Sequence, residues 1–294
     1  MFLQLLANGI ATGSVIALAA VGVSLVYGIL RLVNFAHGDF MVFGAFVAVW
    51  LNVNVGLSIL PAAVLATAAT AALSLLLEGI LWRPLRRRGA RFMGLFLASI
   101  GLALILRQAI FLVAGPQPRS YLVDPYKVYV LGDIRLSGGQ GTAIVVGAAA
   151  IVVVGLLLGL TTAGRTMRAV ADDQALAAVA GVNTGRVIAF TWVVSGLLAG
   201  LAGVLAALVQ SSFDPNFGFS LLLPVFAAVV LGGIGSAYGA LLGGLFLGIV
   251  TELSTWSSLA GGVNPVYKPV VAFAVLIAAL LVRPQGLLGR ARLA

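Results

Sequence analysis

The chain has 294 residues, of which 62% are hydrophobic and 9% are charged, and its formal net charge is +9. Because a soluble domain is about 45–50% apolar and about 25% charged, these few charges cannot cover a water-facing surface. The sequence therefore predicts an integral membrane protein. The chain has no cysteine and one histidine, which excludes disulfides, iron–sulfur clusters and multi-histidine metal sites.

Long apolar stretches occupy most of the chain. A helix needs about 20 residues to cross the hydrocarbon core of a bilayer. The apolar stretches are 2–30, 40–51, 55–82, 92–114, 141–163, 187–210, 219–253 and 266–282. They predict an all-α polytopic membrane bundle that forms a single domain over 1–294, with about eight to nine spanning or re-entrant helices.

Two of these stretches are unusual. The stretch 40–51 is short and follows the polar run from Arg31 to Asp39. The stretch 219–253 is too long for one span and carries Gly232-Gly-Ile-Gly-Ser-Ala-Tyr-Gly239 at its middle. We expect a broken helix pair there, either two spans or two half-helices that meet at the glycines. Broken helices often mark transport pathways.

Glycines recur at helical spacing in two of the later spans. Gly196, Gly200 and Gly203 share one helix face, and Gly244 and Gly248 share another. Small residues at this spacing let helices approach closely in membranes, so we expect close helix packing at both faces.

The distribution of basic residues predicts the orientation, because cytoplasmic loops carry more Lys and Arg. Twelve of the 17 basic residues lie at Arg31, in 83–91, in 164–186 or after residue 282, whereas four lie in 115–140 or at Lys268. We therefore expect loops 83–91 and 164–186 and the C-terminus in the cytoplasm. The loops expected outside are 115–140, 211–218 and 254–265.

Common enzyme and nucleic-acid signatures are absent or poorly placed. The chain contains no G-x-x-x-x-G-K-[ST] phosphate-binding loop, so we do not expect it to hydrolyse ATP. Asp172 and Asp173 are adjacent carboxylates in a basic loop, and a solvated helix face explains them better than acid–base catalysis. Nucleic-acid binding is disfavoured because the basic residues lie between apolar spans.

The loop 164–186 predicts a short amphipathic helix over 165–180 that ends at Gly181. Its expected apolar stripe contains Met167, Val170, Ala171, Leu176 and Val179. Such a helix either lies on the membrane or docks a cytoplasmic partner.

Four runs of residues resemble one transporter family in the same order along the chain. They are Tyr27–Asp39 (YGILRLVNFAHGD), Gly164–Asp173 continuing to Asn183, Val230–Ser236 and Arg283–Gly286. These runs resemble the branched-chain amino acid ABC transporter permeases of the LivH type, and the likeness extends from Asn8 to Gly286.

The resemblance implies half of an ABC importer in the bacterial inner membrane. Its implied partners are a second homologous permease, two ABC ATPases, a soluble substrate-binding protein and the lipid bilayer. ATP would be used by the ATPase partners, and this chain would bind no cofactor and no metal.

The loop 164–186 is the region that such a permease would present to its ATPases. Ala177-Ala178 followed by Gly181 fits the Ala-Ala-x-x-Gly core of importer coupling loops, although Leu176 replaces the leading glutamate of that motif. The predicted ATPase-coupling residues are Arg165, Arg168, Asp172, Asp173, Ala177, Ala178 and Gly181.

Polar residues and glycines inside or next to apolar stretches are candidates for the substrate pathway or its gate. They are Asn34, His37, Asp39, Arg107, Gln108, Gly232, Gly233, Gly235 and Ser236. Ionisable groups near lipid usually face the bundle interior and are paired. His37 could pair with Asp39, Asp39 could instead cap a helix N-terminus, and Arg107 could pair with Asp39 or Glu252.

Structural alternatives remain open for other polar residues. The half-helix ends near 232–239 could hold a substrate carboxylate through backbone N–H groups. Glu78 and Arg83 are expected to pair or to reach the membrane surface. Gln210, Asp214 and Asn216 could meet a docking protein or form a turn at Asp214-Pro215.

The predicted function is translocation of branched-chain or other apolar amino acids by alternating access, driven by separate ATPases. One alternative is an ion-coupled secondary transporter in which His37, Asp39 and Arg107 form a relay. A second alternative is a passive pore for small solutes such as urea or amides.

Overall fold

The computed structural model describes residues 2–123, 128–131, 134–256, 262–283 and 285–288. Its helices are α1 (Phe2–Leu30), α2 (His37–Val49), α3 (Ile59–Leu77), α4 (Arg83–Arg87), α5 (Phe92–Ala114), α6 (Gly138–Leu160), α7 (Thr162–Asp172), α8 (Gln174–Val179), α9 (Thr184–Gln210), α10 (Phe217–Gly232), α11 (Ala237–Leu253) and α12 (Lys268–Val282). Three short turns join them: the π-helical η1 (Trp50–Asn54) and η2 (Glu78–Trp82) and the 3₁₀ turn η3 (Pro265–Tyr267).

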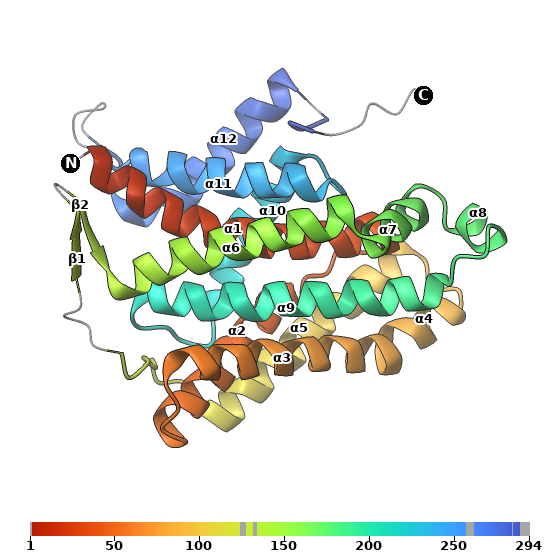
Figure 1. Ribbon diagram of the computed structural model, residues 1–294, viewed down its shortest axis with the longest axis horizontal. Helices are drawn as coiled ribbons and strands as arrows, with labels where there is room; N and C mark the ends of the chain where they lie inside the picture. The colour runs from red at the N-terminus through yellow and green to blue at the C-terminus, as the bar shows by residue number, and fades with distance from the viewer. Residues whose placement is uncertain (1, 124–127, 132–133, 257–261, 284, 289–294) are drawn as a thin grey trace.

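The helices form one elongated bundle in which the long helices run nearly parallel or antiparallel to one another (Figure 1). Six helical segments within the described residues are long and apolar enough to cross a membrane, and α10 and α11 are shorter apolar helices. Together with the short α2, these segments confirm the predicted polytopic helical bundle and its expected number of helices.

Helices α1 and α9 occupy the centre of the bundle. Most residues of α1 are buried, and its apolar residues extend around the whole helix, as expected for a helix surrounded by others. In contrast, Leu112 and Val113 of α5 and Leu281 of α12 are more than four-fifths exposed. These outer helices present apolar surface to lipid or to another membrane subunit.

Glycines bring the central helices into contact, as predicted. A Cβ added at Gly9 would lie 2.8 Å from the Cα of Ile249, so α1 and α11 approach at backbone distance. A Cβ added at Gly44 of α2 would lie 2.7 Å from the Cα of Gly200 on α9. Gly203 faces the backbone of Met41 in the same way, so only glycine fits this part of the α2–α9 contact.

The first broken helix separates α1 from α2. The chain turns at Arg31, whose φ of 52° is in the left-handed region, and then runs without helical hydrogen bonds to Ala36. Ser99 of α5 satisfies this segment, because its hydroxyl accepts from Phe35 N at 3.3 Å and donates to Val33 O at 3.2 Å. Non-helical backbone is tolerated in a membrane only where protein supports it in this way.

The second predicted break lies between α10 and α11. The two helices form an antiparallel pair that turns through 233–236. Helix α11 packs along α1 from Gly9 to Ala17, and the turn lies against Gly28 near the end of α1. The stretch 219–253 therefore enters the bundle and returns, as predicted. Leu287 N and Leu288 N donate to Leu231 O and Gly232 O, so the segment 285–288 covers the turn.

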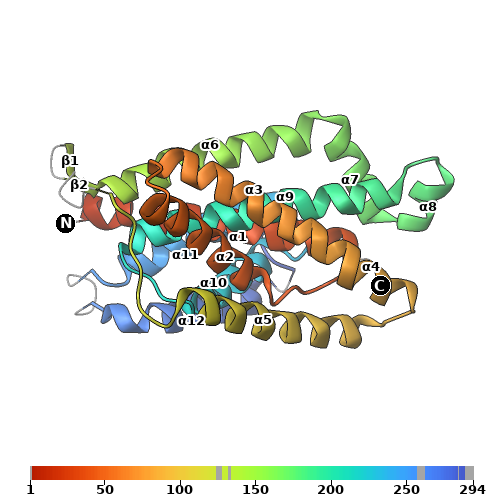
Figure 2. The same cartoon turned by 90° about the horizontal axis from the view of Figure 1, so that it is seen from below.

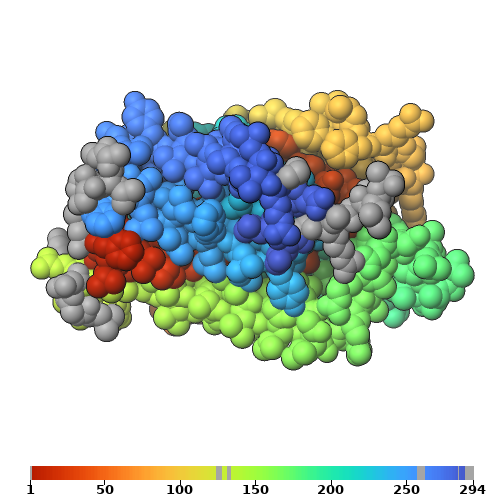
Figure 3. Space-filling view, turned by 90° about the horizontal axis from the view of Figure 1, so that it is seen from above, coloured from red at the N-terminus to blue at the C-terminus, as the bar shows by residue number. Residues whose placement is uncertain are grey.

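Loops gather at two opposite ends of the bundle. At the end that we call the hairpin end, β1 (Val128–Leu131) and β2 (Ile134–Ser137) form a two-stranded antiparallel sheet in which Val128 faces Ser137. Gln4 binds the backbone of Arg135 there. Figure 3 shows the N-terminal part of α1 (red) beside the nearby end of α11 (blue).

The opposite end, which we call the arginine end, carries α4 and the α7–α8 segment (Figure 2). Helix α8 projects beyond the rest of the bundle in both ribbon views. Loops 115–123 and 211–216 meet at the hairpin end, where Arg119 and Phe213 form a β-bridge. The two loop sets that the basic residues distinguish therefore lie at opposite ends.

Two local predictions are wrong. Residues 165–180 form two helices rather than one, because the Asp173 carboxylate accepts from the N–H groups of Ala175 and Leu176 and so begins a new helix. Leu176 and Val179 are 67% and 88% exposed, so they do not continue the stripe of Met167 and Val170. Glu78 does form an ion pair, but its partner is Arg86 rather than Arg83, and the expectation that Arg83 reaches the membrane surface stays a prediction.

Candidate functional site

A buried ion pair connects the first broken helix to α5. Arg107 Nε lies 3.0 Å from Asp39 Oδ1, and the guanidinium stacks over the Phe219 ring of α10 at 4.9 Å from the ring centroid. The Asp39 side chain is 1% exposed and that of Arg107 is 15% exposed. Of the two partners considered for Arg107, the structure selects Asp39, and the pair links α2, α5 and α10.

Asp39 lies in the first turn of α2 but is not its N-cap residue, and it pairs with Arg107 rather than with His37. Helix α2 begins after Ala36, which makes no side-chain cap, and the Asp39 carboxylate is directed to Arg107. His37 is fully buried in α2 and packs on Gly22 of α1, where an added Cβ would lie 2.8 Å from the imidazole Cε1. The small size of Gly22 makes room for the imidazole.

Asn34 and Gln108 differ in their relation to this cluster. The buried Asn34 side chain accepts from Ala36 N at 3.1 Å, which forms the turn that starts α2. Gln108 lies on the exposed face of α5, so the structure does not bring it to the Asp39–Arg107 pair. Ser99 forms hydrogen bonds to the extended segment, and the sequence did not predict this role. Ser99 and Phe35 are 64 residues apart in the chain, so no local pattern indicates their contact.

The predicted glycine turn is tightly packed. Gly233 and Gly235 have φ values of 103° and 87°, which favour glycine. Ser236 caps α11 by accepting from Gly239 N at 3.1 Å. A Cβ on Gly286 would lie 2.6 Å from Gly233 N, so the backbone after α12 packs directly on this turn. Carboxylate binding by this turn stays a prediction.

The α7–α8 segment is anchored on one side and exposed on the other. The Arg168 guanidinium donates to Leu158 O near the end of α6, while Ala177 is buried. Gly181 has a φ of 87° and ends the segment, as predicted. Arg165, Asp173 and Ala178 are exposed, as is Asp172, which retains an interaction within the chain.

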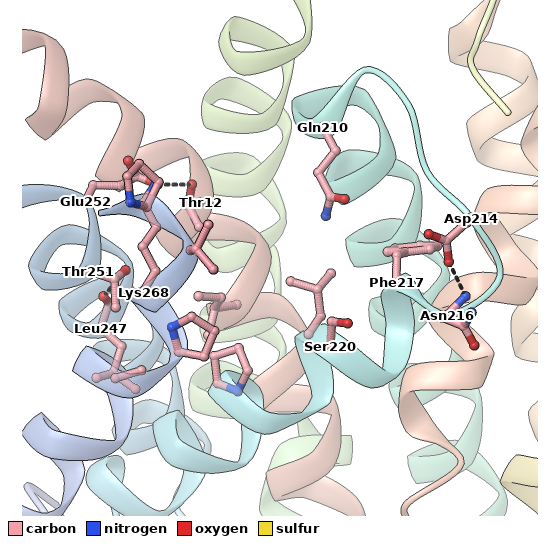
Figure 4. Close-up of a pocket in the computed structure, with 17 residues that line it drawn as sticks. Thr12, Gln210, Asp214, Asn216, Phe217, Ser220, Leu247, Thr251, Glu252 and Lys268 are labelled. Atoms are coloured by element: carbon pink, nitrogen blue, oxygen red, sulfur yellow. Dashed lines mark hydrogen bonds and ion pairs between the residues drawn. The ribbon is translucent and has the colours of Figure 1, made fainter. Parts of the chain in front are cut away.

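A cavity of about 510 Å³ opens near the hairpin end, between α1, α10, α11 and α12. Figure 4 shows its polar residues on two walls, with Thr12, Thr251, Glu252 and Lys268 on one and Gln210, Asp214, Asn216 and Ser220 on the other. Its apolar lining residues are Ile16, Phe217, Leu221, Pro224, Leu247, Pro265, Val266, Pro269 and Ala272. None of the residues predicted for the substrate pathway lines it.

An ion pair stands on one wall of this cavity. Lys268 Nζ of α12 lies 2.7 Å from Glu252 Oε1 of α11, and Thr12 Oγ1 of α1 lies 3.4 Å from the same oxygen. Glu252 is thus engaged by Lys268 rather than by Arg107. On the other wall, Asp214 Oδ1 accepts from Asn216 N at 2.6 Å, which confirms the turn expected at Asp214-Pro215.

Aromatic residues fasten the loops beside the cavity. Phe213 packs on Phe46, Tyr121 and Phe217. The Tyr121 hydroxyl donates to Ala45 O at 3.2 Å, and burial raises the pKa of this phenol above its usual value. The phenol therefore stays protonated and acts as a donor. Sequence analysis missed this cluster, because its members come from three distant segments.

Comparison with known proteins gives matches along nearly the whole chain. A family model described as the permease component of the branched-chain amino acid transport system matches residues 5–280. The permease protein BraD of Pseudomonas aeruginosa is 35% identical over 98% of this chain and 96% of its own. LivH of Escherichia coli K12 is 33% identical over the same shares. A probable LivH of Methanocaldococcus jannaschii is 30% identical over 97% of this chain and 92% of its own.

Proposed function

We propose that this chain, which belongs to the family of branched-chain amino acid transport system permeases, is the membrane-spanning subunit of an ABC importer for branched-chain or other apolar amino acids. The observation that carries the proposal is the match over nearly the full length of both chains. A shared motif alone would indicate similarity of one segment only. The alignment with BraD covers 98% of this chain and so includes every helix of the bundle.

The exposed face of α8 supports a coupling role at the arginine end. Leu176 and Val179 present apolar side chains to solvent on a six-residue helix that projects from the bundle. Exposed apolar residues that lie together are typical of a docking surface. We assign this surface to the ATPase partners, with Arg165, Arg168, Asp172, Asp173, Ala177, Ala178 and Gly181 forming or positioning it.

The proposed mechanism is alternating access. A loaded binding protein docks at the hairpin end, and ATP binding and hydrolysis in two ATPase subunits act on α7–α8. This chain has no phosphate-binding loop of its own, so the ATPases use the ATP and this subunit needs no cofactor. Partners can bias the two states only through contacts that differ between them.

The broken helices are the proposed moving parts. Asp39 and Arg107 connect the start of α2 to α5, and Phe219 extends the contact to α10. A shift of α2 would therefore be transmitted to the pair of helices α10 and α11. We place the gate at this cluster, with His37 and Asn34 at the break, and keep the turn with Gly232, Gly233, Gly235 and Ser236 as a candidate carboxylate site.

The complex that we propose pairs this chain with a second homologous permease in the bacterial inner membrane. The exposed apolar faces of α5 and α12 leave surface for a second permease as well as for lipid. The positive-inside rule puts the arginine end and the C-terminus in the cytoplasm and the hairpin end outside.

Reconstitution tests the proposal. The chain is purified with its co-purifying subunits, placed in liposomes and supplied with the soluble binding protein. We expect uptake of leucine or valine. This uptake should require ATP on the side of the membrane where the arginine end lies. Uptake by the chain alone, driven by an ion gradient or simply downhill, would replace the proposal with a secondary transporter or a pore.

The docking surface is tested in the same preparation with Leu176→Glu and Val179→Glu. Both side chains are exposed, so the bundle should keep its thermal stability while the ATPase subunits are lost from the purified complex. Gln174→Glu is the matched control, because it adds the same charge at an exposed position of α8. Retention of the ATPases by both the Leu176→Glu and the Val179→Glu variant would argue against docking at α8.

A further inference from the structure

The wall of the cavity that carries the ion pair has two layers. The polar layer contains Thr12, Glu252 and Lys268, contributed by α1, α11 and α12. Ile16 and Ala272 follow Thr12 and Lys268 by four residues, which places each about one helical turn, or about 5.4 Å, farther from the hairpin end.

The third helix repeats this arrangement in the opposite direction. Helix α11 runs antiparallel to α1, so its apolar residue precedes its polar residue, and Leu247 lies five residues before Glu252. Ile16, Leu247 and Ala272 all line the cavity. An apolar layer from three helices therefore lies below a polar layer from the same three helices.

The charges of the polar layer match those of an α-amino acid. The zwitterion of an α-amino acid carries its ammonium and its carboxylate on the same carbon atom, and Lys268 Nζ and Glu252 Oε1 lie 2.7 Å apart. An ammonium has three donors and a carboxylate has about four acceptor positions. Both groups can therefore bind a second partner, and the Lys268 side chain is 31% exposed.

The volume also suits a small ligand. Ligand sites are typically about 300–1,000 Å³, mostly apolar, with a few polar groups that fix the orientation, and this cavity measures about 510 Å³. The apolar layer begins about one turn below the charges, within reach of a short branched side chain.

We propose that this cavity is a transient binding site for a neutral apolar α-amino acid. Lys268 binds the α-carboxylate, Glu252 binds the α-ammonium, and the side chain of the amino acid lies against the layer of Ile16, Leu247 and Ala272, whose residues are at most 3% exposed. The identity of the ligand rests on the proposed function, whereas the site itself rests on the cavity and its ion pair. The site requires both charged groups of the ligand and disfavours a charged side chain.

A thiol-protection experiment tests the site. The chain has no cysteine, so Ser220→Cys places its single thiol at an exposed position of the facing cavity wall. The purified complex in nanodiscs is treated with a thiol reagent, and labelling of this chain is followed by mass spectrometry. We expect leucine to slow the labelling of this thiol several-fold.

Analogues and a control thiol make the test specific. 3-Methylbutylamine lacks the carboxylate of leucine and 4-methylpentanoate lacks the ammonium, so neither should protect Ser220→Cys. Labelling of Ser212→Cys, at an exposed position that does not line the cavity, should not respond to leucine. Equal protection by leucine and either analogue, or no protection by leucine, would overturn the proposal.

Two variants of the ion pair complete the design. Lys268→Met with Glu252→Gln removes both charges without leaving one unpaired, and it should abolish protection by leucine. Lys268→Arg keeps the positive charge and should retain protection. ATP-driven uptake by the unsubstituted complex is measured in parallel. Uptake without protection overturns only the cavity site, whereas protection without uptake overturns only the importer.

Discussion

Arg107 shows how strongly a single residue depends on its partner. Its guanidinium is hydrogen-bonded to Asp39 within the bundle, and the Asp39 side chain is 1% exposed. Removing one member of a buried ion pair leaves an uncompensated charge, which costs about 3–5 kcal/mol, whereas replacing both members by apolar residues is often neutral or stabilising.

We therefore expect Arg107→Leu to lower the thermal stability of the permease strongly. Arg107→Leu combined with Asp39→Leu should restore most of it, since no buried charge is left alone. The measurement is the fraction of monodisperse protein that survives heating in detergent. Arg135→Leu, at an exposed position of the hairpin end, controls for the loss of one positive charge, and equal stability of the single and double variants would contradict the prediction.

The sequence predicted that Arg107 forms an ion pair, because an arginine within an apolar stretch needs a counter-charge. It could not choose between Asp39 and Glu252, since both carboxylates lie far from Arg107 in the sequence. The packing of α2 against α5 decides this choice. Lys268 then takes Glu252, and this second pair gives the cavity wall its two opposite charges.

Close packing between whole helices depends on glycines, and Gly203 at the contact of α2 with α9 is the clearest example. A Cβ on Gly203 would overlap the backbone carbonyl of Met41 in α2. A backbone group cannot rotate away as a long side chain can. Overpacking of this kind costs about 1–3 kcal/mol, so one added methyl group should loosen the α2–α9 contact.

We expect Gly203→Ala to lower the melting temperature and Gly101→Ala to leave it unchanged or raise it. Gly101 lies in the middle of α5, and nothing lies within 4 Å of the position of its added Cβ. There the substitution gains helix propensity, about 1 kcal/mol. Thermal unfolding of both variants in the same detergent decides the matter, and equal shifts would show that the close approach of the backbones contributes nothing.

The sequence predicted the ends of helices correctly where neighbouring residues determine them. Apolar length predicted the long spans, and Gly181 predicted the end of the α7–α8 segment. The division at Asp173 was missed, although Asp is a favoured cap residue, because residues 165–180 are mainly strong helix formers. The two strands β1 and β2 were also not predicted, since the loop 115–140 carries no strong alternation of apolar and polar residues.

The whole molecule has two chemically different ends, and this gives a test of its orientation. Three of the five arginines of 83–91 lie at exposed or partly exposed positions of α4, and Arg88 and Arg91 are exposed next to it. The α7–α8 segment adds Arg165 and Arg168. The hairpin end gathers the N-terminal part of α1, the β-hairpin and loop 211–216.

We expect a membrane-impermeant thiol reagent to label Ser212→Cys in intact spheroplasts, whereas Gln174→Cys should react only after permeabilisation. Both positions are exposed, and the absence of native cysteine makes each thiol unique in this chain. Labelling of Gln174→Cys without permeabilisation would reverse the assigned orientation.

The sequence by itself determined the membrane environment, the helical class, the family and the separation of the loops into two sets, because these properties depend on composition, apolar length, local motifs and charge counts. Only the tertiary structure decided which charges pair, how the glycine turn is packed and where a cavity opens. The cavity has no sequence signature, because Thr12, Glu252 and Lys268 come from three distant segments. Their convergence depends on how α1, α11 and α12 pack, and long-range packing is not encoded in any local window of the chain.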